Sequence, residues 1–161
     1  MKSAVKKTKA PKTKPSFGVV ESYLRALSDK AGKVASQSLA PATMIEQVQG
    51  GLRVQELDAL RDSLEVPMEK LASKLGISKA TLHRRKAQGR LGPAESERVV
   101  RLARLMGKAA KVLGGIEAAR QWLNSPQFGL GNAVPLDYAE TEIGAREVEN
   151  LLGRIEYGVY S

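Results

Sequence analysis

One segment of the sequence gathers side chains that could contact the phosphates and bases of DNA. Groups that could donate hydrogen bonds to phosphate oxygens are supplied by Ser78, Thr81, Arg85, Lys86 and Arg90. Side chains that could reach the edges of bases are Lys79, His83 and Arg84. An arginine joined to guanine by two hydrogen bonds is the commonest specific contact in the major groove. These residue types, collected within a short stretch, predict a DNA-reading surface.

The sequence contains carboxylates, but other residue types that enzymes and metal sites use are scarce or absent. His83 is the only histidine, and the chain has no cysteine. These counts exclude disulfide scaffolds, zinc fingers, thiol chemistry and iron–sulfur clusters. The sequence also has no Gly-rich phosphate loop and no pairing of a nucleophile with a base. We therefore expect no catalytic residue, metal or cofactor, and we place His83 on the exposed face of a DNA-reading helix.

Two short helices joined by a tight turn must position the DNA-reading side chains. A helix-turn-helix needs a small residue where its helices cross and a glycine in the turn. Ala72 and Gly76 supply both. Apolar residues that would hold the angle between the helices are Leu71, Leu75, Ile77 and Leu82. Arg85 stands where a further apolar residue is usual, three positions after Leu82, and its aliphatic stem could cover apolar surface there.

Apolar residues recur at helical spacing from residue 17 onward, so we expect an all-α helical bundle. Pro67 can be the first residue of one helix, and Ser78 can cap the next. The expected helices cover about residues 20–27, 44–48, 54–64, 67–75, 79–88, 93–113, 116–123 and 145–155, with a short one beginning at 135. No segment alternates convincingly as a β-strand would.

The formal net charge of +9 is distributed very unevenly along the 161 residues. Residues 1–16 carry +6 and little apolar surface, which predicts a disordered basic tail, either a solubilising arm or one that adds phosphate contacts. Residues 17–65 carry −2 and form N-terminal helices that could supply a dimer contact. Residues 66–108, the helix-turn-helix region, carry +8, and residues 109–161 carry −3. This asymmetry indicates two separate roles on one chain.

The hydropathy of the chain argues against a membrane or secretory class. No apolar run approaches the roughly 18 residues that a membrane span needs. No apolar stretch follows the basic start of the sequence, so we expect no secretory signal. We expect a soluble, cytoplasmic protein with an anionic partner.

Residues 109–161 hold most of the aromatic side chains, among them Trp122, Phe128, Tyr157 and Tyr160. Aromatic residues near the end of a chain either pack back on their own domain or are covered by a partner. Trp122 suits the core better than an interface, because large aromatic residues are highly buried on average. Both interpretations stay open for the two tyrosines.

Short runs in the C-terminal third resemble the toxin-binding domain of Xre/MbcA/ParS antitoxins. The similar runs are AARQWL at 118–123, NSP at 124–126, LG at 130–131, VPL at 134–136, GAREVE at 144–149 and LLGRIEYGVY at 151–160. Upstream, LGIS at 75–78 and TLHRR at 81–85 are similar to the Xre-like helix-turn-helix of the same family. The resemblance covers roughly residues 43–161, and we transfer nothing onto residues 1–40.

This resemblance implies an antitoxin of a RES–Xre type II toxin–antitoxin pair. A RES-domain toxin consumes NAD, and its antitoxin lies with its C-terminal segment at the mouth of the NAD pocket. The antitoxin also represses its own operon by binding operator DNA, usually as a homodimer, which here would form through helices outside the C-terminal region. The toxin-binding residues implied are Trp122, Phe128, Leu130, Arg154, Ile155, Glu156, Tyr157, Gly158, Val159, Tyr160 and Ser161. Glu156 and the Ser161 carboxylate could engage toxin cations that otherwise hold the pyrophosphate.

Two further interpretations compete with the antitoxin. A stand-alone helix-turn-helix repressor would use residues 109–161 to respond to a small ligand or to cell state, with no toxin partner. An architectural nucleic-acid protein would rely on the basic tail, and its binding would fall with salt and show little sequence preference. The first of these is the principal alternative.

Overall fold

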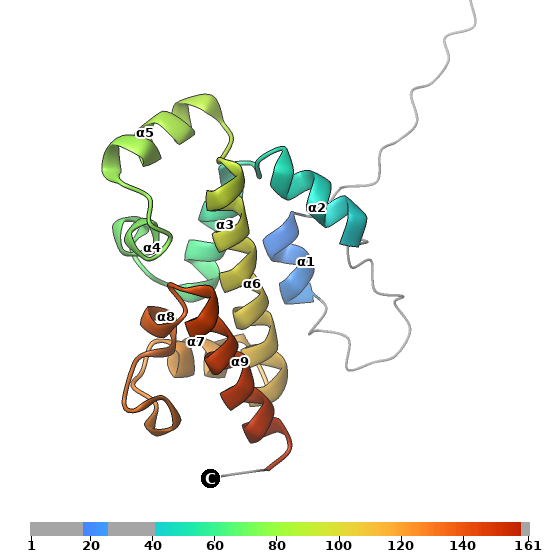
Figure 1. Ribbon diagram of the computed structural model, residues 1–161, viewed down its shortest axis with the longest axis vertical. Coiled ribbons are helices and arrows are strands. Elements are labelled where there is room, and N and C mark those ends of the chain that lie inside the picture. Colours follow the sequence, from blue (N-terminus) through green and yellow to red (C-terminus); the bar gives the residue numbers. More distant parts are fainter. Residues whose placement is uncertain (1–17, 26–40, 159–161) are drawn as a thin grey trace, which may run out of the picture.

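The longest helix, α6 (Pro93–Leu113), runs through the middle of the molecule, and five other helices pack along it (Figure 1). The computed structural model describes residues 18–25 and 41–158. The helices that pack on α6 are α1 (Val19–Arg25), α2 (Pro41–Gln49), α3 (Gln55–Leu64), α7 (Ile116–Leu123) and α9 (Glu142–Glu156). The remaining elements are α4 (Met68–Lys74), α5 (Lys79–Gln88), the 3₁₀ turn η1 (Phe128–Leu130) and α8 (Pro135–Tyr138).

The prediction of an all-α fold is confirmed for these described ranges, which contain no strand and only two isolated β-bridges. The core is built almost entirely from aliphatic side chains, as the low aromatic content requires. Leu57, Leu60 and Leu64 form the apolar stripe of α3 and are fully buried. In α6 the buried stripe contains Val99, Leu102, Ala103, Leu105 and Met106. A period of three to four residues thus places one face of each helix in the core.

Helix ends lie close to where the local sequence signals place them. Ser78 caps α5, and Gly89 and Gly114 end α5 and α6 in the left-handed conformation, with φ of +76° and +91°. Three starts differ from the prediction. Helices α2 and α9 each begin three residues earlier than predicted, at Pro41 and Glu142. Pro67 is the residue before α4, with extended backbone, and not its first helical residue. Extended φ and ψ suit a residue that only flanks the helix, and Met68 then begins α4.

A buried carboxylate joins α1 to α3, and nothing in the sequence pattern predicted it. Glu56 accepts hydrogen bonds from the backbone amides of Val19 and Val20, at 2.9 and 3.0 Å. A side chain at Gly18 would place its Cβ only 2.4 Å from a Glu56 carboxylate oxygen. The carboxylate therefore satisfies two amides at the start of α1 that have no partner within the helix.

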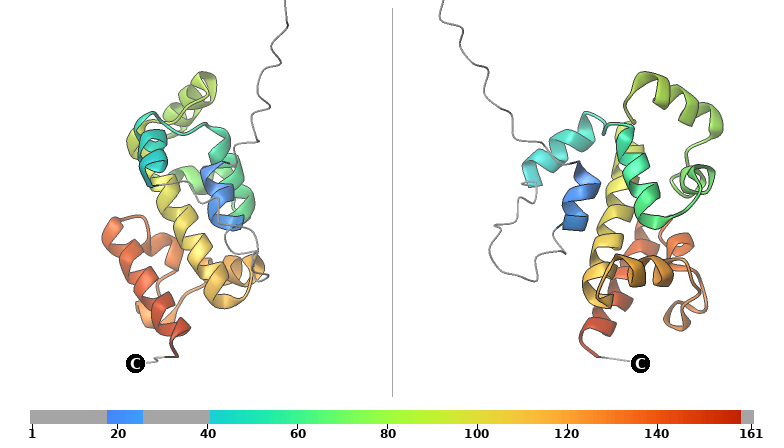
Figure 2. Two further views of the ribbon diagram at one scale, coloured as in Figure 1. Left: turned by 90° about the vertical axis from the view of Figure 1, so that its right-hand side faces the viewer. Right: turned by 180° about the vertical axis from the view of Figure 1, so that it is seen from behind.

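The predicted tail at residues 1–16 and the last residues of the predicted 20–27 helix lie outside the described residues. Within the described part of the chain, no helix is both long and apolar enough to span a bilayer. In both views of Figure 2, α5 and the end of α9 lie at opposite ends of the molecule. The two segments singled out by charge and aromatic content are therefore well separated in space.

Candidate functional sites

Local hydrogen bonds build the turn between α4 and α5. The turn residue Gly76 adopts a φ of +66°, a conformation that favours glycine. The amide of Ile77 donates to the carbonyl of Ala72 at 2.8 Å, and the Ala72 side chain is buried. The Arg98 guanidinium of α6 donates to the Leu75 carbonyl at 3.0 Å. The turn is thus fixed both by its own backbone and by α6.

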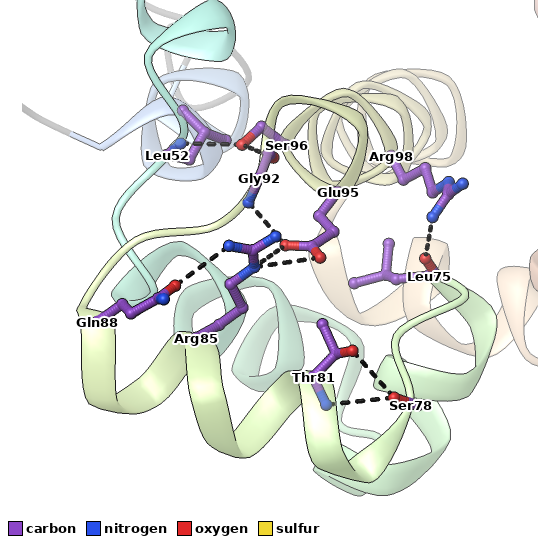
Figure 3. Close-up of polar contacts among 10 residues, drawn as sticks. All are labelled: Leu52, Leu75, Ser78, Thr81, Arg85, Gln88, Gly92, Glu95, Ser96 and Arg98. Atoms are coloured by element: carbon purple, nitrogen blue, oxygen red, sulfur yellow. Dashed lines mark hydrogen bonds and ion pairs between the residues drawn. The ribbon is translucent and has the colours of Figure 1, made fainter.

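The first turn of α5 is closed by a side-chain cap. The Ser78 hydroxyl oxygen accepts a hydrogen bond from the Thr81 amide at 3.2 Å and lies 3.0 Å from the Thr81 hydroxyl oxygen (Figure 3). A serine in this position satisfies one of the free amides at a helix N-terminus. Ser78 is exposed and Thr81 half-buried. Both hydroxyl groups therefore have a structural partner already.

Four of the predicted DNA-contacting side chains are free on the surface of α5. Lys79, His83, Arg84 and Lys86 are exposed, and within the described residues none of their side chains forms a hydrogen bond or an ion pair. α5 has no buried residue, and it projects from one end of the molecule (Figure 1). Lys79, His83 and Lys86 follow a spacing of four and three, which places them on one face of the helix.

The two other predicted phosphate contacts have partners within the chain. The Arg85 Nε donates to both carboxylate oxygens of Glu95, at 2.9 and 3.2 Å, and its Nη1 donates to the Gln88 side chain at 3.2 Å (Figure 3). Arg90 donates to the Gly51 carbonyl at 3.0 Å. Arg85 is half-buried, as its position in the apolar set of the motif suggested.

At the other end of the molecule, two aromatic residues project into solvent. Phe128 is 92% exposed and Tyr157 is 81% exposed. Phe128 begins η1, which is held in place by Leu130, a core residue that is only 8% exposed. At Gly129 a Cβ would lie 2.6 Å from a Leu151 methyl, so η1 rests closely on α9. The short loop thus supports Phe128 while Leu130 faces inward.

The remaining predicted partner-binding residues lie in different surroundings. Trp122 is half-buried against the core, and its carbonyl accepts a hydrogen bond from Gln127 at 3.0 Å. Arg154 and Ile155 are half-buried, Gly158 is exposed, and Glu156 is exposed with a carboxylate oxygen 4.0 Å from the Lys111 ammonium. Val159, Tyr160 and Ser161 lie outside the described residues.

Sequence reasoning missed one exposed apolar side chain on α9. Ile143 is 79% exposed. It lies fourteen positions before Tyr157, which at 100° per residue places the two within about 40° of the same helix face. The apolar residues of the core stripe, Ala145, Val148 and Leu152, follow a different phase. Plotting α9 on a helical wheel would have shown Ile143 outside that stripe.

Ion pairs fasten the C-terminal helices to α6. Arg101 donates to Glu142 at 2.9 Å, and Arg104 donates to Glu149 at 2.7 Å. Lys74 of α4 also pairs with Asp137 of α8. The two ends of the molecule are therefore joined by the continuous helix α6, about 30 Å long at 1.5 Å per residue, and by contacts along its sides.

Comparison with known families assigns one domain to each end of the molecule. Residues 43–104 match the antitoxin Xre-like helix-turn-helix domain. Residues 108–158 match the antitoxin Xre/MbcA/ParS C-terminal toxin-binding domain. The chain is 35% identical over 139 residues to a protein of Yersinia enterocolitica named antitoxin Xre, covering 85% of this chain and 92% of that protein. A Photorhabdus laumondii protein of the same name is 32% identical over 123 residues, which are 75% of each chain.

Proposed function

Because this chain belongs to the Xre/MbcA/ParS family of antitoxins, we propose that it neutralises a RES-domain toxin that consumes NAD. In this proposal the C-terminal segment blocks the active site of the toxin, and the helix-turn-helix represses the operon of the pair. An antitoxin acts by binding, so the chain is a regulatory protein and not an enzyme. Repression of an operon requires access to the chromosome, which places the proposed activity in the cytoplasm.

The observation that carries the toxin proposal is the exposure of Phe128 and Tyr157. Large aromatic side chains of this kind are enriched among the residues that dominate binding energy at protein interfaces. Both lie within residues 108–158, which match the toxin-binding domain. In this proposal Leu130 and Trp122 do not contact the toxin directly. They pack in and against the core and support the contact surface.

The negative charge of residues 109–161 supports the proposal that this region binds at the active site of the toxin. Residues 109–161 carry a net −3, and an NAD pocket normally receives an anionic dinucleotide. Glu156 is exposed, and the ion pair that it forms with Lys111, the one it has among the described residues, is long, at 4.0 Å. An exposed pair of this length contributes little stability, so the carboxylate can exchange Lys111 for a cation of the toxin.

For the DNA half of the function, we assign base contacts to Lys79, His83 and Arg84 and a phosphate contact to Lys86. These side chains are exposed on α5 and unpaired within the described residues. One helix-turn-helix offers few base contacts, so operator affinity requires a dimer that reads two half-sites. We place the dimer contact in the helices before residue 66, away from the toxin-binding end.

Replacing Arg84 with alanine should weaken operator binding by about 1–3 kcal/mol and relax the preference at one base position. The guanidinium is lost from the surface of α5, where it supports no other residue of the described structure. Binding to operator variants, followed by fluorescence anisotropy, measures both effects. Arg146→Ala removes the same charge from α9 and serves as the control. Equal operator affinity for Arg84→Ala and the wild type would mean that Arg84 does not contact a base as proposed.

Co-expression with the neighbouring gene tests the toxin proposal. We expect that gene, expressed alone, to stop growth and deplete cellular NAD, and this chain to restore both. A neighbouring product that leaves NAD unchanged would contradict a RES-type partner. If no neighbouring product is toxic and operator binding persists, the chain acts as a stand-alone repressor.

A further inference from the structure

The orientation of the recognition helix α5 depends on very few contacts. α5 has no fully buried residue, and Leu82 is the side chain of α5 that packs against the core. Its N-terminal end is held by the Ser78 cap and the adjoining turn. Residues 89–92 separate its C-terminal end from α6. The residues that follow α5 are tied to the segment before α3, since the Gly89 carbonyl accepts from the Val54 amide at 3.1 Å and the Leu91 amide donates to the Leu52 carbonyl at 2.8 Å. The angle between the second half of α5 and the rest of the molecule therefore depends on these backbone bonds and on the side-chain contacts of α5 with α6.

The ion pair of Arg85 with Glu95 is one of these side-chain contacts. The Arg85 Nε contacts both carboxylate oxygens of Glu95, at 2.9 and 3.2 Å. Glu95 also accepts a hydrogen bond from the Gly92 amide at 2.7 Å, so one carboxylate caps α6 and grips α5 (Figure 3). The side chains of Arg85 and Glu95 are 24% and 12% exposed. An ion pair that is largely shielded from water is favourable only when its hydrogen-bond geometry is kept, whereas a surface pair tolerates more movement.

The surroundings of the pair are also fixed. The Ser96 hydroxyl donates to the Gly92 carbonyl at 2.8 Å and accepts from the Leu52 amide at 2.9 Å. A Cβ at residue 92 would lie 2.8 Å from the Arg85 Nη2, so the guanidinium lies directly over the glycine. Glu95 is therefore anchored in a network that reaches the core, and Arg85 is the only one of these residues that belongs to α5.

We propose that Arg85 is a positioning residue, which sets the orientation of α5 through Glu95, and that it does not contact a DNA phosphate. The inference rests on the proposed operator binding and refines it, because Arg85 is one of the residues that the sequence assigns to phosphate contact. The phosphate and base contacts then belong to the side chains of α5 that are exposed and unpaired in the described structure, Lys79, His83, Arg84 and Lys86.

The two roles of Arg85 predict opposite effects of Glu95→Gln on operator affinity. If Arg85 binds a phosphate, Glu95 competes for the guanidinium and repels the DNA, so removing its charge strengthens binding. If Arg85 positions α5, the change releases the helix and weakens binding, although the protein becomes more positive. We expect operator affinity to fall about tenfold, which is within the range of coupling energies measured for residues in contact. Glutamine keeps an oxygen that can accept from the Gly92 amide, so the α6 cap is preserved.

The experiment measures operator affinity for the full-length wild type, Glu95→Gln, Arg85→Met and the double variant. Methionine keeps the apolar stem of Arg85 and removes its guanidinium. We expect each single variant to bind about tenfold more weakly and the double variant to be no weaker than Arg85→Met, because both changes break the same pair. As the matched control, Lys86→Met should add its full loss to that of Glu95→Gln, since Lys86 shares no partner with Glu95.

Glu95→Gln that binds the operator as tightly as the wild type, or more tightly, would overturn the positioning role, and so would strictly additive losses in the double variant. Circular dichroism verifies that each variant is folded. If Arg85→Met does not fold, the sign of the Glu95→Gln effect decides alone. A wild type that binds no operator would refute the repressor function together with this inference, whereas a binding wild type with an unaffected Glu95→Gln refutes the inference only.

Discussion

Gly144→Ala is expected to destabilise the C-terminal helices severely. A Cβ at Gly144 would lie 1.7 Å from the carbonyl oxygen of Tyr138 and 2.7 Å from its carbonyl carbon. Both atoms belong to the backbone, so no change of rotamer can relieve the overlap, and α8 and α9 must separate. We expect the free energy of unfolding to fall by about 3 kcal/mol, which is the upper end of the usual cost of overpacking a buried contact.

Gly153 provides the matched control within the same helix. A Cβ there has no neighbouring atom within 4 Å, and the backbone of Gly153 is helical. Gly153→Ala should therefore raise the free energy of unfolding by up to about 1 kcal/mol, because alanine is the better helix former. Urea unfolding followed by circular dichroism compares the two variants. Equal stability of Gly144→Ala and Gly153→Ala would contradict the close approach of α9 to α8.

Removing the two exposed aromatic side chains, in Phe128→Ala/Tyr157→Ala, is expected to abolish toxin neutralisation and leave the fold intact. Phe128 and Tyr157 are 92% and 81% exposed, so their truncation removes little buried area from the free protein. In a complex such anchors are each worth about 2 kcal/mol or more. The double variant should therefore bind the toxin at least several hundredfold more weakly, at about tenfold per 1.4 kcal/mol.

Calorimetry with the purified toxin and a thermal melt of the free variant measure these two effects. Ile45→Ala is the appropriate control, because Ile45 is an apolar residue of α2 that is 56% exposed and lies outside the toxin-binding domain. It should bind the toxin like the wild type. If the double aromatic variant keeps wild-type toxin affinity, Phe128 and Tyr157 are not toxin contacts.

The parts of the fold that depend on neighbouring residues could be predicted from the sequence. Ser78, Gly76 and Gly89 mark the ends of two helices because a cap and a left-handed residue act within a few positions of the chain. The periodicity of Leu57, Leu60 and Leu64 likewise fixes the inner face of α3. These signals are local, and the structure places the corresponding elements within a few residues of the prediction.

Contacts between distant parts of the chain could not be predicted in this way. The hydrogen bonds from Val19 and Val20 to Glu56 span 37 and 36 positions, and no local pattern marks a carboxylate as buried. Arg85 was assigned to a phosphate by its charge alone. Its carboxylate partner Glu95 could be identified only when the angle between α5 and α6 was known.

The candidate partner surface shows the same division. Phe128 was singled out by its residue type and lies exposed, whereas Leu130, two positions later, lies in the core. A 3₁₀ turn of three residues is too short for periodicity to distinguish its inner from its outer side chains. Ile143 was missed for a different reason. It is an apolar residue near a predicted core stripe, and such residues are normally assigned to the core.

The central claim is that DNA binding and toxin binding occupy opposite ends of the molecule, and one paired measurement tests it most directly. Operator repression and toxin neutralisation are measured in the same cells for Arg84→Ala and for Phe128→Ala/Tyr157→Ala. We predict that Arg84→Ala loses repression and still neutralises the toxin, and that the aromatic variant loses neutralisation and still represses. Loss of both activities in each folded variant would contradict two separate surfaces and would refute the account.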